Sequence, residues 1–277
     1  MLISTVEILK KARENHYGVV APNVFEMNSV KEVFEVANTL RSPIIIGCPS
    51  QLDLEVIAEA TKFYSRRYPD VVASLNLDHG KSFDSAVRAI KAGFTSVMVD
   101  RSTLPFEDNV RETLEVVKMA HAVGVSVEAE LGHVGQGASY DKDRDSGLTD
   151  PDEAVRFVEK TNVDCLAVAI GTAHGQYIGV PKLDFDRLIS LREKVPVPLV
   201  LHGGSSTGDE NLKKAVELGI SKVNISTDLK IKGAEYIKKY VSDGSCNNLF
   251  SIIEEGIKGW KEMLIHYIKL FGSEGKV

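Results

Sequence analysis

The chain has 277 residues, of which 43% are hydrophobic and 26% charged. This balance is typical of a folded protein with a large buried core and excludes a disordered or fibrous chain. With 33 basic and 39 acidic residues the net charge is -6, and no basic run is interleaved with aromatic residues. We therefore expect no nucleic-acid partner, and an anionic ligand would need a local site built from backbone N–H groups or a metal ion.

Cysteine usage and the N-terminal segment indicate where the protein works. Cys48 and Cys165 lie in apolar runs, and with Cys246 they form an odd set without metal-type spacing. We expect Cys48 and Cys165 to be buried thiols, and all three cysteines to stay out of disulfides in a cytoplasmic protein. Residues 1–15 have the period of an amphipathic helix and lack the apolar core and cleavage site of a signal peptide, so we expect neither export nor a membrane partner.

Eight short, β-branched-rich runs alternate along the chain with longer segments of helical period. Their continuous hydrophobicity predicts strands that are covered on both faces. The predicted strands are 18–21, 43–47, 71–77, 96–99, 126–131, 165–169, 198–201 and 222–225. The predicted helices are 29–40, 52–68, 82–91, 106–121, 150–160, 185–193 and 209–217, with two more between 227 and 271.

Eight strand–helix units predict an α/β fold, a (β/α)8 TIM barrel with additional C-terminal helices, as one domain over residues 1–277. A dinucleotide-binding sheet is the weaker alternative because no glycine fingerprint follows the first strand. In such a barrel the catalytic groups lie at the C-terminal ends of the strands. Residues 132–147 form the longest connection without a predicted element, and we interpret it as an active-site lid.

Three of the seven histidines lie at predicted strand ends. His79 ends the third strand, His174 follows the sixth and His202 ends the seventh, so the barrel would bring all three to one face. Three imidazoles with open positions predict a catalytic divalent metal, and nitrogen ligands favour Zn²⁺ over Mg²⁺. A purely structural role is the alternative for any single histidine, and the convergence of three makes it the weaker one.

Two carboxylates lie at comparable strand ends, Asp78 beside the first histidine and Glu130 in the run VEAELG. Either could orient a metal ligand or move a proton, and for Asp78 the alternative is a hydrogen bond to a histidine. Asp100 and Glu128 also lie near strand ends, where we expect a supporting or structural role.

Glycine-rich turns follow the last three strands and read GTAHG, HGGSS and NISTD. The last strands of such barrels commonly bind phosphate, and the segment HGGSSTGDEN opens a helix whose N-terminus favours negative charge. Glycine lets the backbone approach a ligand, and hydroxyl and amide groups donate to it. The predicted anion-binding residues are Gly175, Gly203, Gly204, Ser205, Asn224, Ser226 and Thr227.

In this order, LDHG, EAELG, AIGTAHG, LHGGSS and KVNISTD resemble the class II fructose-bisphosphate and tagatose-bisphosphate aldolase family. The resemblance runs from Ala21-Pro22-Asn23 to the closing KLFGS. It implies a zinc-dependent barrel enzyme that cleaves a phosphorylated ketose between C3 and C4, giving dihydroxyacetone phosphate and an aldehyde. It also implies a monovalent cation near the phosphate, and we expect a homodimer or homotetramer that uses the C-terminal helices.

The resemblance assigns roles to individual residues. His79, His174 and His202 match the zinc ligands, Asp78 matches the acid/base that handles the C4 hydroxyl, and Glu130 matches a carboxylate beside the metal. Cleavage leaves an enediolate, whose charge zinc stabilises without a Schiff base. A lysine-based aldolase would need a buried lysine near a strand end, and strand cores such as CLAVA and PLVL contain none. The matched phosphate-binding residues are Gly175, Gly203, Ser205, Asn224 and Thr227, and Asn23 is a further substrate-binding candidate.

Three departures from the family pattern matter, and one is that Asn76 stands where the family usually has a histidine. Where the family has a proton-transferring carboxylate, this chain reads Gly135-Gln136-Gly137-Ala138, and Asp141 and His133 are the nearest substitutes. The family holds the distal phosphate of a bisphosphate with a late arginine, but no arginine follows Arg192 here, although Lys230 or Lys232 could replace it. Specificity for fructose 1,6-bisphosphate is therefore not carried over.

We expect a cytoplasmic, Zn²⁺-dependent aldolase that acts on a ketose (bis)phosphate such as fructose 1,6-bisphosphate. One alternative is a class II aldolase for a phosphorylated ketose without a distal phosphate. Another is a non-catalytic phosphosugar-binding barrel subunit. The missing loop carboxylate favours this alternative, whereas the presence of all three predicted metal-binding histidines argues against it. A zinc hydrolase barrel is less compatible, because no His-x-His pair ends the first strand.

Overall fold

The computed structural model describes residues 1–140, 147–244 and 248–277. The strands are β1 Val19–Pro22, β2 Ile44–Pro49, β3 Ala73–Gly80, β4 Ser96–Val99, β5 Ser126–Leu131, β6 Gly135–Gln136, β7 Cys165–Val168, β8 Ala173–His174, β9 Leu199–Leu201 and β10 Ile220–Ile225. The helices are α1 Thr5–Glu14, α2 Met27–Leu40, α3 Leu54–Arg67, α4 Phe83–Ala92, α5 Phe106–His121, α7 Pro151–Thr161, α8 Phe185–Lys194, α9 Asp209–Glu217, α10 Thr227–Ser242 and α11 Leu249–Leu270, with a short 3-10 turn at Gly137–Ser139.

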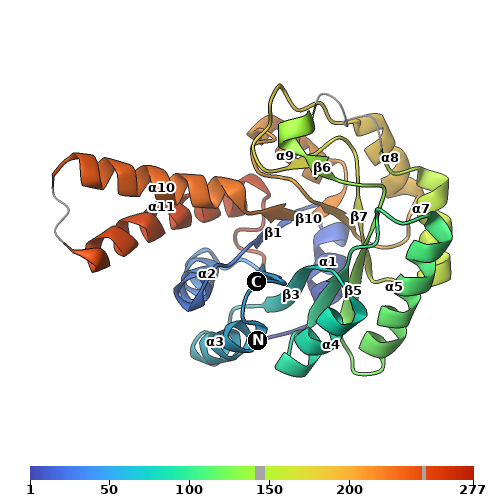
Figure 1. Ribbon diagram of the computed structural model, residues 1–277, viewed down its shortest axis with the longest axis horizontal. Coiled ribbons are helices and arrows are strands. Elements are labelled where there is room, and N and C mark those ends of the chain that lie inside the picture. The colour runs from blue at the N-terminus through green and yellow to red at the C-terminus, as the bar shows by residue number, and fades with distance from the viewer. Residues whose placement is uncertain (141–146, 245–247) are drawn as a thin grey trace.

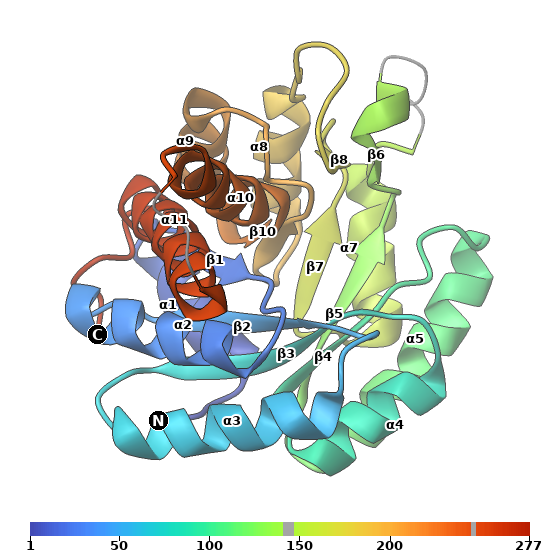
Figure 2. The ribbon, with the colours of Figure 1, turned by 60° about the vertical axis from the view of Figure 1, so that its left-hand side comes forward.

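Eight parallel strands form the predicted barrel, in the spatial order β1-β10-β9-β7-β5-β4-β3-β2. Val24 N donates to Gly47 O (2.9 Å) and joins the first and last strands of this order. Helices surround the strands, as Figures 1 and 2 show. The (β/α)8 fold with additional C-terminal helices is thereby confirmed.

Helix starts follow the capping signals of the sequence. The Ser82 side chain accepts a hydrogen bond from Ser85 N before α4, and Asp150 accepts from Asp152 N and Glu153 N before α7. Each cap satisfies a backbone donor that the first helical turn leaves unpaired. These helices therefore begin within a residue of the predicted starts.

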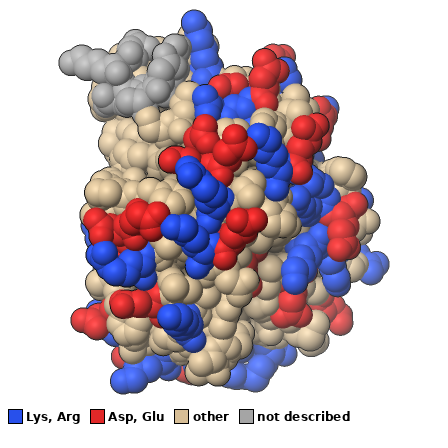
Figure 3. Space-filling view, turned by 90° about the vertical axis from the view of Figure 1, so that its right-hand side faces the viewer, with Lys and Arg blue, Asp and Glu red and all other residues tan. Residues whose placement is uncertain are grey.

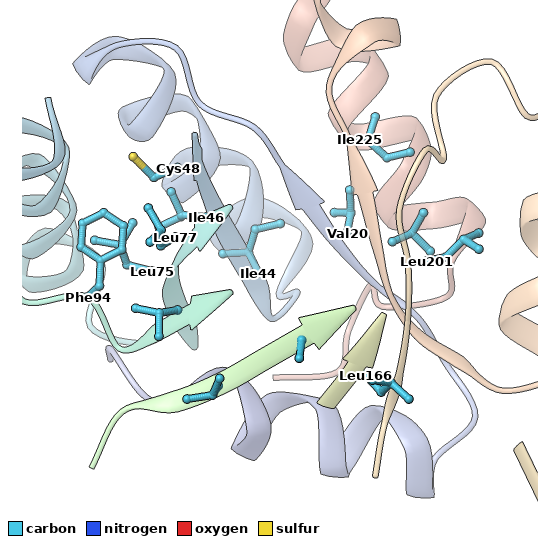
Figure 4. Packing of buried hydrophobic residues seen from close by; sticks show 14 of the residues in the cluster. Val20, Ile44, Ile46, Cys48, Leu75, Leu77, Phe94, Leu166, Leu201 and Ile225 are labelled. Carbon is cyan, nitrogen blue, oxygen red and sulfur yellow. The ribbon is translucent and has the colours of Figure 1, made fainter. Parts of the chain in front are cut away.

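The core has two layers. One layer lies between the strands and the surrounding helices, and Figure 4 shows part of it, including Ile44, Leu75 and Ile225. The other fills the barrel interior, where Ile8 and Leu9 of α1 pack against inward-facing residues of the strands. Because α1 closes the end where the strands begin, the opposite end is the one available for a site.

Two of the three cysteines lie in the core, Cys48 in the outer layer and Cys165 in the barrel interior. Cys48 and Cys165 are buried and free, as expected. Cys246 lies outside the described residues, so that part of the expectation stays a prediction.

The segment predicted as an irregular lid contains an ordered portion. Gly135 and Gln136 of β6 pair in parallel with Ala173 and His174 of β8, and a 3-10 turn follows. The expectation that residues 132–147 hold no element is therefore wrong for 135–139. Neither two-residue strand is long enough to show an alternation in the sequence. Asp141, one of the two candidate bases, lies outside the described residues.

Helices α10 and α11 form an arm that projects from the barrel (Figure 1). They pack closely because glycines lie between them; a Cβ on Gly259 would come within 2.5 Å of Lys232 O. An ion pair between Lys261 of α11 and Glu32 of α2 ties the arm to the barrel (2.5 Å). The arm is therefore anchored at its base and free of the barrel at its far end.

The surface carries charges of both signs. Figure 3 shows lysine and arginine interspersed with aspartate and glutamate on one face. Ion pairs join neighbouring helices, such as Lys160 with Glu107 and Lys194 with Asp152 (both 2.7 Å). Across the described part of the chain, every helix is too short or too polar to cross a bilayer.

Candidate active site

A cavity of about 310 Å³ opens at the C-terminal ends of the barrel strands. It brings together every residue that the sequence predicted for the site except Glu130 and Gly204. Gly204 packs against β10 instead, since a Cβ there would meet Val223 at 2.6 Å. The lining residues are Asn23, Pro49, Ser50, Gln51, Asp78, His79, Lys81, His174, Gly175, His202, Gly203, Ser205, Asn224, Ser226, Thr227 and Lys230.

Three imidazoles converge in this cavity from β3, β8 and the end of β9. The ring centroid of His79 lies 5.0 Å from that of His174 and 4.7 Å from that of His202. One ring nitrogen of each histidine lies within 4.8 Å of the other two. This spacing suits three ligands of a single ion, which is the arrangement that catalytic zinc sites use.

Hydrogen bonds behind the rings determine which nitrogens face one another. His79 Nδ1 bonds Asp100 Oδ2 (2.9 Å), and His202 Nε2 bonds Glu128 Oε1 (2.7 Å). The remaining nitrogens, His79 Nε2 and His202 Nδ1, face each other at 3.0 Å. His174 Nε2 is buried without a protein partner. Such an unpaired nitrogen beside two others fits a bound divalent metal.

A backbone irregularity allows two consecutive residues of β3 to reach the cavity. Neighbouring strand residues normally point to opposite faces. Here the register of β3 against β4 shifts between Leu77 and Gly80, and His79 has a φ of 49°. A non-glycine residue in this left-handed region costs free energy, and such strain concentrates at functional sites. The shift turns both Asp78 and His79 toward the cavity.

Asp78 is held by two amides. Asn23 Nδ2 donates to its Oδ2 (2.8 Å) and Asn224 Nδ2 donates to its Oδ1 (2.9 Å). Burial alone would raise the pKa of Asp78, but the nearby charges of His79, His202 and Lys222 lower it to about 2. The group is therefore an ionised acceptor with a fixed orientation, and Asn23 and Asn224 contact it directly.

Glu130 lies behind His79 rather than in the cavity wall. With His79 and Asp100 it forms a second group of potential metal ligands within 4.8 Å. Its Oε1 accepts a hydrogen bond from Val134 N (3.0 Å), and its Oε2 has no partner. Burial and the charge of Asp100 raise the pKa of Glu130 to about 8. Glu130 is thus able to hold a proton at neutral pH.

The opposite side of the cavity is suited to an anion. Gly203 has a φ of 66°, and a Cβ there would lie 2.5 Å from Ala173 O, so only glycine fits this turn. Ser205 Oγ accepts hydrogen bonds from Ser226 N (3.2 Å) and Asp228 N (3.3 Å) at the start of α10. These bonds bring the β9 turn against the N-terminus of a 16-residue helix, which favours negative charge.

A buried lysine corrects one expectation from the sequence. Lys222 on β10 is completely buried, whereas we expected no lysine in the strand cores. Its Nζ forms an ion pair with Glu128 and does not line the cavity. It is therefore not placed to form a Schiff base with a ligand there. The signal was present in the sequence, since Lys222 lies two residues before Asn224 and so shares its face of the strand.

Sequence reasoning also missed several cavity residues. Ser50 and Gln51 follow β2, and Lys81 follows β3, at positions where no motif marked them. Lys230 lines the cavity one turn into α10, whereas Lys232 pairs with Glu235 and Glu262 outside it. Of the two late lysines, Lys230 is thus the one near a ligand.

His133 is the candidate base that the structure describes. Its side chain is 49% exposed, and its Nδ1 lies 3.0 Å from Ser102 Oγ and 4.0 Å from Glu130 Oε1. Ser102 in turn bonds Asp100 (2.8 Å), the partner of His79. His133 is therefore connected to the histidine cluster through two side chains.

Comparison with protein families agrees with this geometry. The model of the family "Fructose-bisphosphate aldolase class-II" matches residues 3–276. The chain belongs to this family. Class II aldolases are lyases, and their phosphorylated sugar substrates suit a cavity that combines three histidines with a wall of glycine and hydroxyl residues.

Solved structures of aldolases are similar over nearly the whole chain. The YdjI aldolase from Escherichia coli K12 has a TM-score of 0.88 and 34% identity, covering 100% of this chain and 99% of that one. A putative fructose-1,6-biphosphate aldolase from Coccidioides immitis has a TM-score of 0.86 and 28% identity, covering 98% and 97%. Fructose-bisphosphate aldolase (Fba) from Campylobacter jejuni shares the fold with a TM-score of 0.84 and 21% identity, covering 100% and 97%.

Proposed function

We propose that this class II aldolase is a cytoplasmic, zinc-dependent enzyme that reversibly cleaves a phosphorylated ketose to dihydroxyacetone phosphate and an aldehyde. The observation that carries the proposal is the convergence of three imidazoles and one ionised carboxylate in a cavity whose far wall suits an anion. A protein that only bound a phosphosugar would need the anion-binding wall but not this cluster.

His79, His174 and His202 are the residues that would hold the metal. When bound, the zinc ion would act as a Lewis acid that stabilises the negative charge of an enediolate. The protein's part is to present three ring nitrogens. Burial opposes the charged form of His79, but Asp100, Asp78 and Glu130 raise its pKa to about 9, so a bound ion would displace a proton from this ring. Burial and the neighbouring His202 and His79 lower the pKa of His174 to about 4, so its nitrogen is available at neutral pH.

The first test is metal content. We expect about one zinc per chain in the purified protein, and its loss in His202→Ala, because a three-nitrogen site tolerates the removal of a ligand poorly. Elemental analysis measures it, with His266→Ala as the control, since His266 pairs with Asp209 on the surface. Full zinc content in His202→Ala, or ketose cleavage that survives exhaustive chelation, would contradict the assignment.

Asp78 would accept the proton of the C4 hydroxyl during cleavage and return it during condensation. Its two oxygens are each bonded to an amide, so the carboxylate cannot turn away from the cavity. An ionised carboxylate in a fixed position is what a general base requires. Asn23 and Asn224 would therefore contribute by orienting Asp78.

The second test separates this proton transfer from enediolate formation. Asp78→Ala should lower the rate of ketose cleavage by ~100-fold or more, the usual scale for loss of a general base. Zinc should stay bound, and proton exchange on dihydroxyacetone phosphate should persist. Asp84→Ala, an exposed change on α4, serves as the control. Equal loss of both reactions with intact zinc would assign Asp78 another role.

The phosphate of dihydroxyacetone phosphate would bind at the wall formed by Gly175, Gly203, Ser205, Ser226 and Thr227. The start of α10 supplies a favourable field there, and the glycines leave room for close approach. A monovalent cation beside the phosphate is part of the proposal, because none of the five residues of this wall carries a positive charge that could neutralise the phosphate.

Lys230 would contact the distal end of the substrate. One charge-assisted hydrogen bond contributes about 1.5 to 3 kcal/mol, or roughly 10- to 100-fold in affinity. With no arginine after Arg192, we therefore propose only a modest preference for a ketose 1,6-bisphosphate over the 1-phosphate. An aldolase for a ketose without a distal phosphate is the second candidate, and the same missing arginine favours it.

The third test compares the two substrates. We expect wild-type kcat/KM values within about 100-fold of each other, and Lys230→Met should remove most of that difference while affecting the 1-phosphate little. Lys232→Met is the matched control, because Lys232 pairs with acidic residues outside the cavity. A preference of several thousand-fold that survives in Lys230→Met would place the distal contact elsewhere.

The arm is the proposed surface for assembly into a homodimer or homotetramer. Phe250 and Leu249 at its far end are 78% and 65% exposed. An apolar groove lies at its base, lined by residues such as Ile253, Ile257 and Trp260. A two-fold axis would place the end of each arm in the groove of a second copy, so both apolar surfaces would be covered at once.

The fourth test is the mass of the protein in solution. We expect an oligomer at micromolar concentration by light scattering, and dissociation in Phe250→Asp, because a carboxylate would be buried in the interface. Phe63→Asp, at a half-exposed phenylalanine of α3, should leave the mass unchanged. A monomeric wild-type protein would exclude this use of the arm.

A further inference from the structure

An ion pair lies inside the barrel, beneath the histidine cluster. Lys222 extends from β10 and Glu128 from β5, and both side chains are completely buried. Burying two charges costs free energy that their attraction often fails to offset. Apolar residues of similar size would fill the same space, so the pair calls for an explanation other than packing.

The contacts of Glu128 explain why a charged pair lies here. Its Oε1 accepts a hydrogen bond from His202 Nε2 (2.7 Å), and its Oε2 accepts from Lys222 Nζ. The Cys165 thiol lies 3.8 Å from the same Oε2. Each carboxylate oxygen therefore has a donor, and one of these donors is a predicted metal ligand.

The hydrogen bond selects one of the two forms of neutral imidazole. A carboxylate can only accept, so the proton of His202 lies on Nε2 and the lone pair on Nδ1. That lone pair points to the centre of the cluster, 3.0 Å from His79 Nε2. Without Glu128, the ring could carry its proton on Nδ1 and would then present a hydrogen to the metal.

We propose that Glu128 is a positioning residue that fixes His202 as a metal ligand through Nδ1, and that Lys222 holds Glu128 in place. The inference rests on the proposed metal site and adds two residues from the barrel interior to it. Hydrogen-bonded partners of metal ligands typically change metal affinity or activity by ~10- to 100-fold. A purely structural pair would change the stability of the barrel but not the metal site specifically.

Two double variants separate these roles. Glu128→Met with Lys222→Met removes both charges and the acceptor, whereas Glu128→Gln with Lys222→Met removes both charges but keeps an amide oxygen that can accept from His202. Because neither leaves an unpaired buried charge, both should fold. Thermal unfolding of the metal-free proteins checks this, and zinc affinity is measured by competition with a chelator.

We expect the Met/Met variant to bind zinc ~10- to 100-fold more weakly than wild type and the Gln/Met variant to recover most of that loss. Equal affinities in wild type and both variants would overturn the proposal, as would an equal loss in both. If the wild-type protein bound no zinc at all, the proposed function would fail instead.

A second measurement is made on the wild-type chain and uses a variant only to assign one resonance. With ¹⁵N-labelled histidine and bound ¹¹³Cd²⁺, NMR should show the metal coupled to Nδ1 of His202 and to Nε2 of His79. His202→Asn assigns the resonance. Coupling to Nε2 of His202 would overturn the proposal, because Glu128 occupies that side of the ring.

Discussion

The site depends on hydrogen bonds that carboxylates accept from the backs of imidazole rings. Asp100 holds His79 by Nδ1, and Glu128 holds His202 by Nε2, so the two rings present different nitrogens to the same point. Such partners must lie inside the protein, where an isolated carboxylate is unfavourable. The charge of Lys222 and the hydrogen bond from His202 offset this cost and lower the pKa of the buried Glu128 to about 2. Buried polar side chains therefore lie directly beneath the cavity, because two imidazoles at its rim take their hydrogen-bond partners from there.

The irregular end of β3 also determines which side chains reach the site. A regular strand would direct either Asp78 or His79 into the cavity, but not both. The register shift and the left-handed conformation of His79 direct both residues inward. Asp78 then lies between Asn23 of the first βα connection and Asn224 of β10, on neighbouring parts of the closed barrel. A local distortion thus joins the proposed metal ligand to the proposed base.

The sequence predicted the barrel and most of the cavity because both depend on repeated patterns. Apolar runs placed the strands, and strand ends placed His79, His174 and His202. What it did not predict depends on side-chain direction. The nitrogen that His202 presents and the pairing of Glu128 with Lys222 both require the register of strands that are distant in sequence. The β6–β8 pair was missed because two residues carry no periodic signal. The expectation for Asp141 stays a prediction, since that residue lies outside the described part of the chain.

Helix α10 connects the proposed substrate site with the proposed assembly surface. It begins at Thr227 in the cavity wall and continues into the arm, and its 16 residues span about 24 Å. Lys230 borders both the cavity and the apolar groove of the arm. A ligand that contacts the first turn and a second copy that contacts the remainder would act on the same helix. By thermodynamic linkage, any factor by which one changes the binding of the other is returned unchanged.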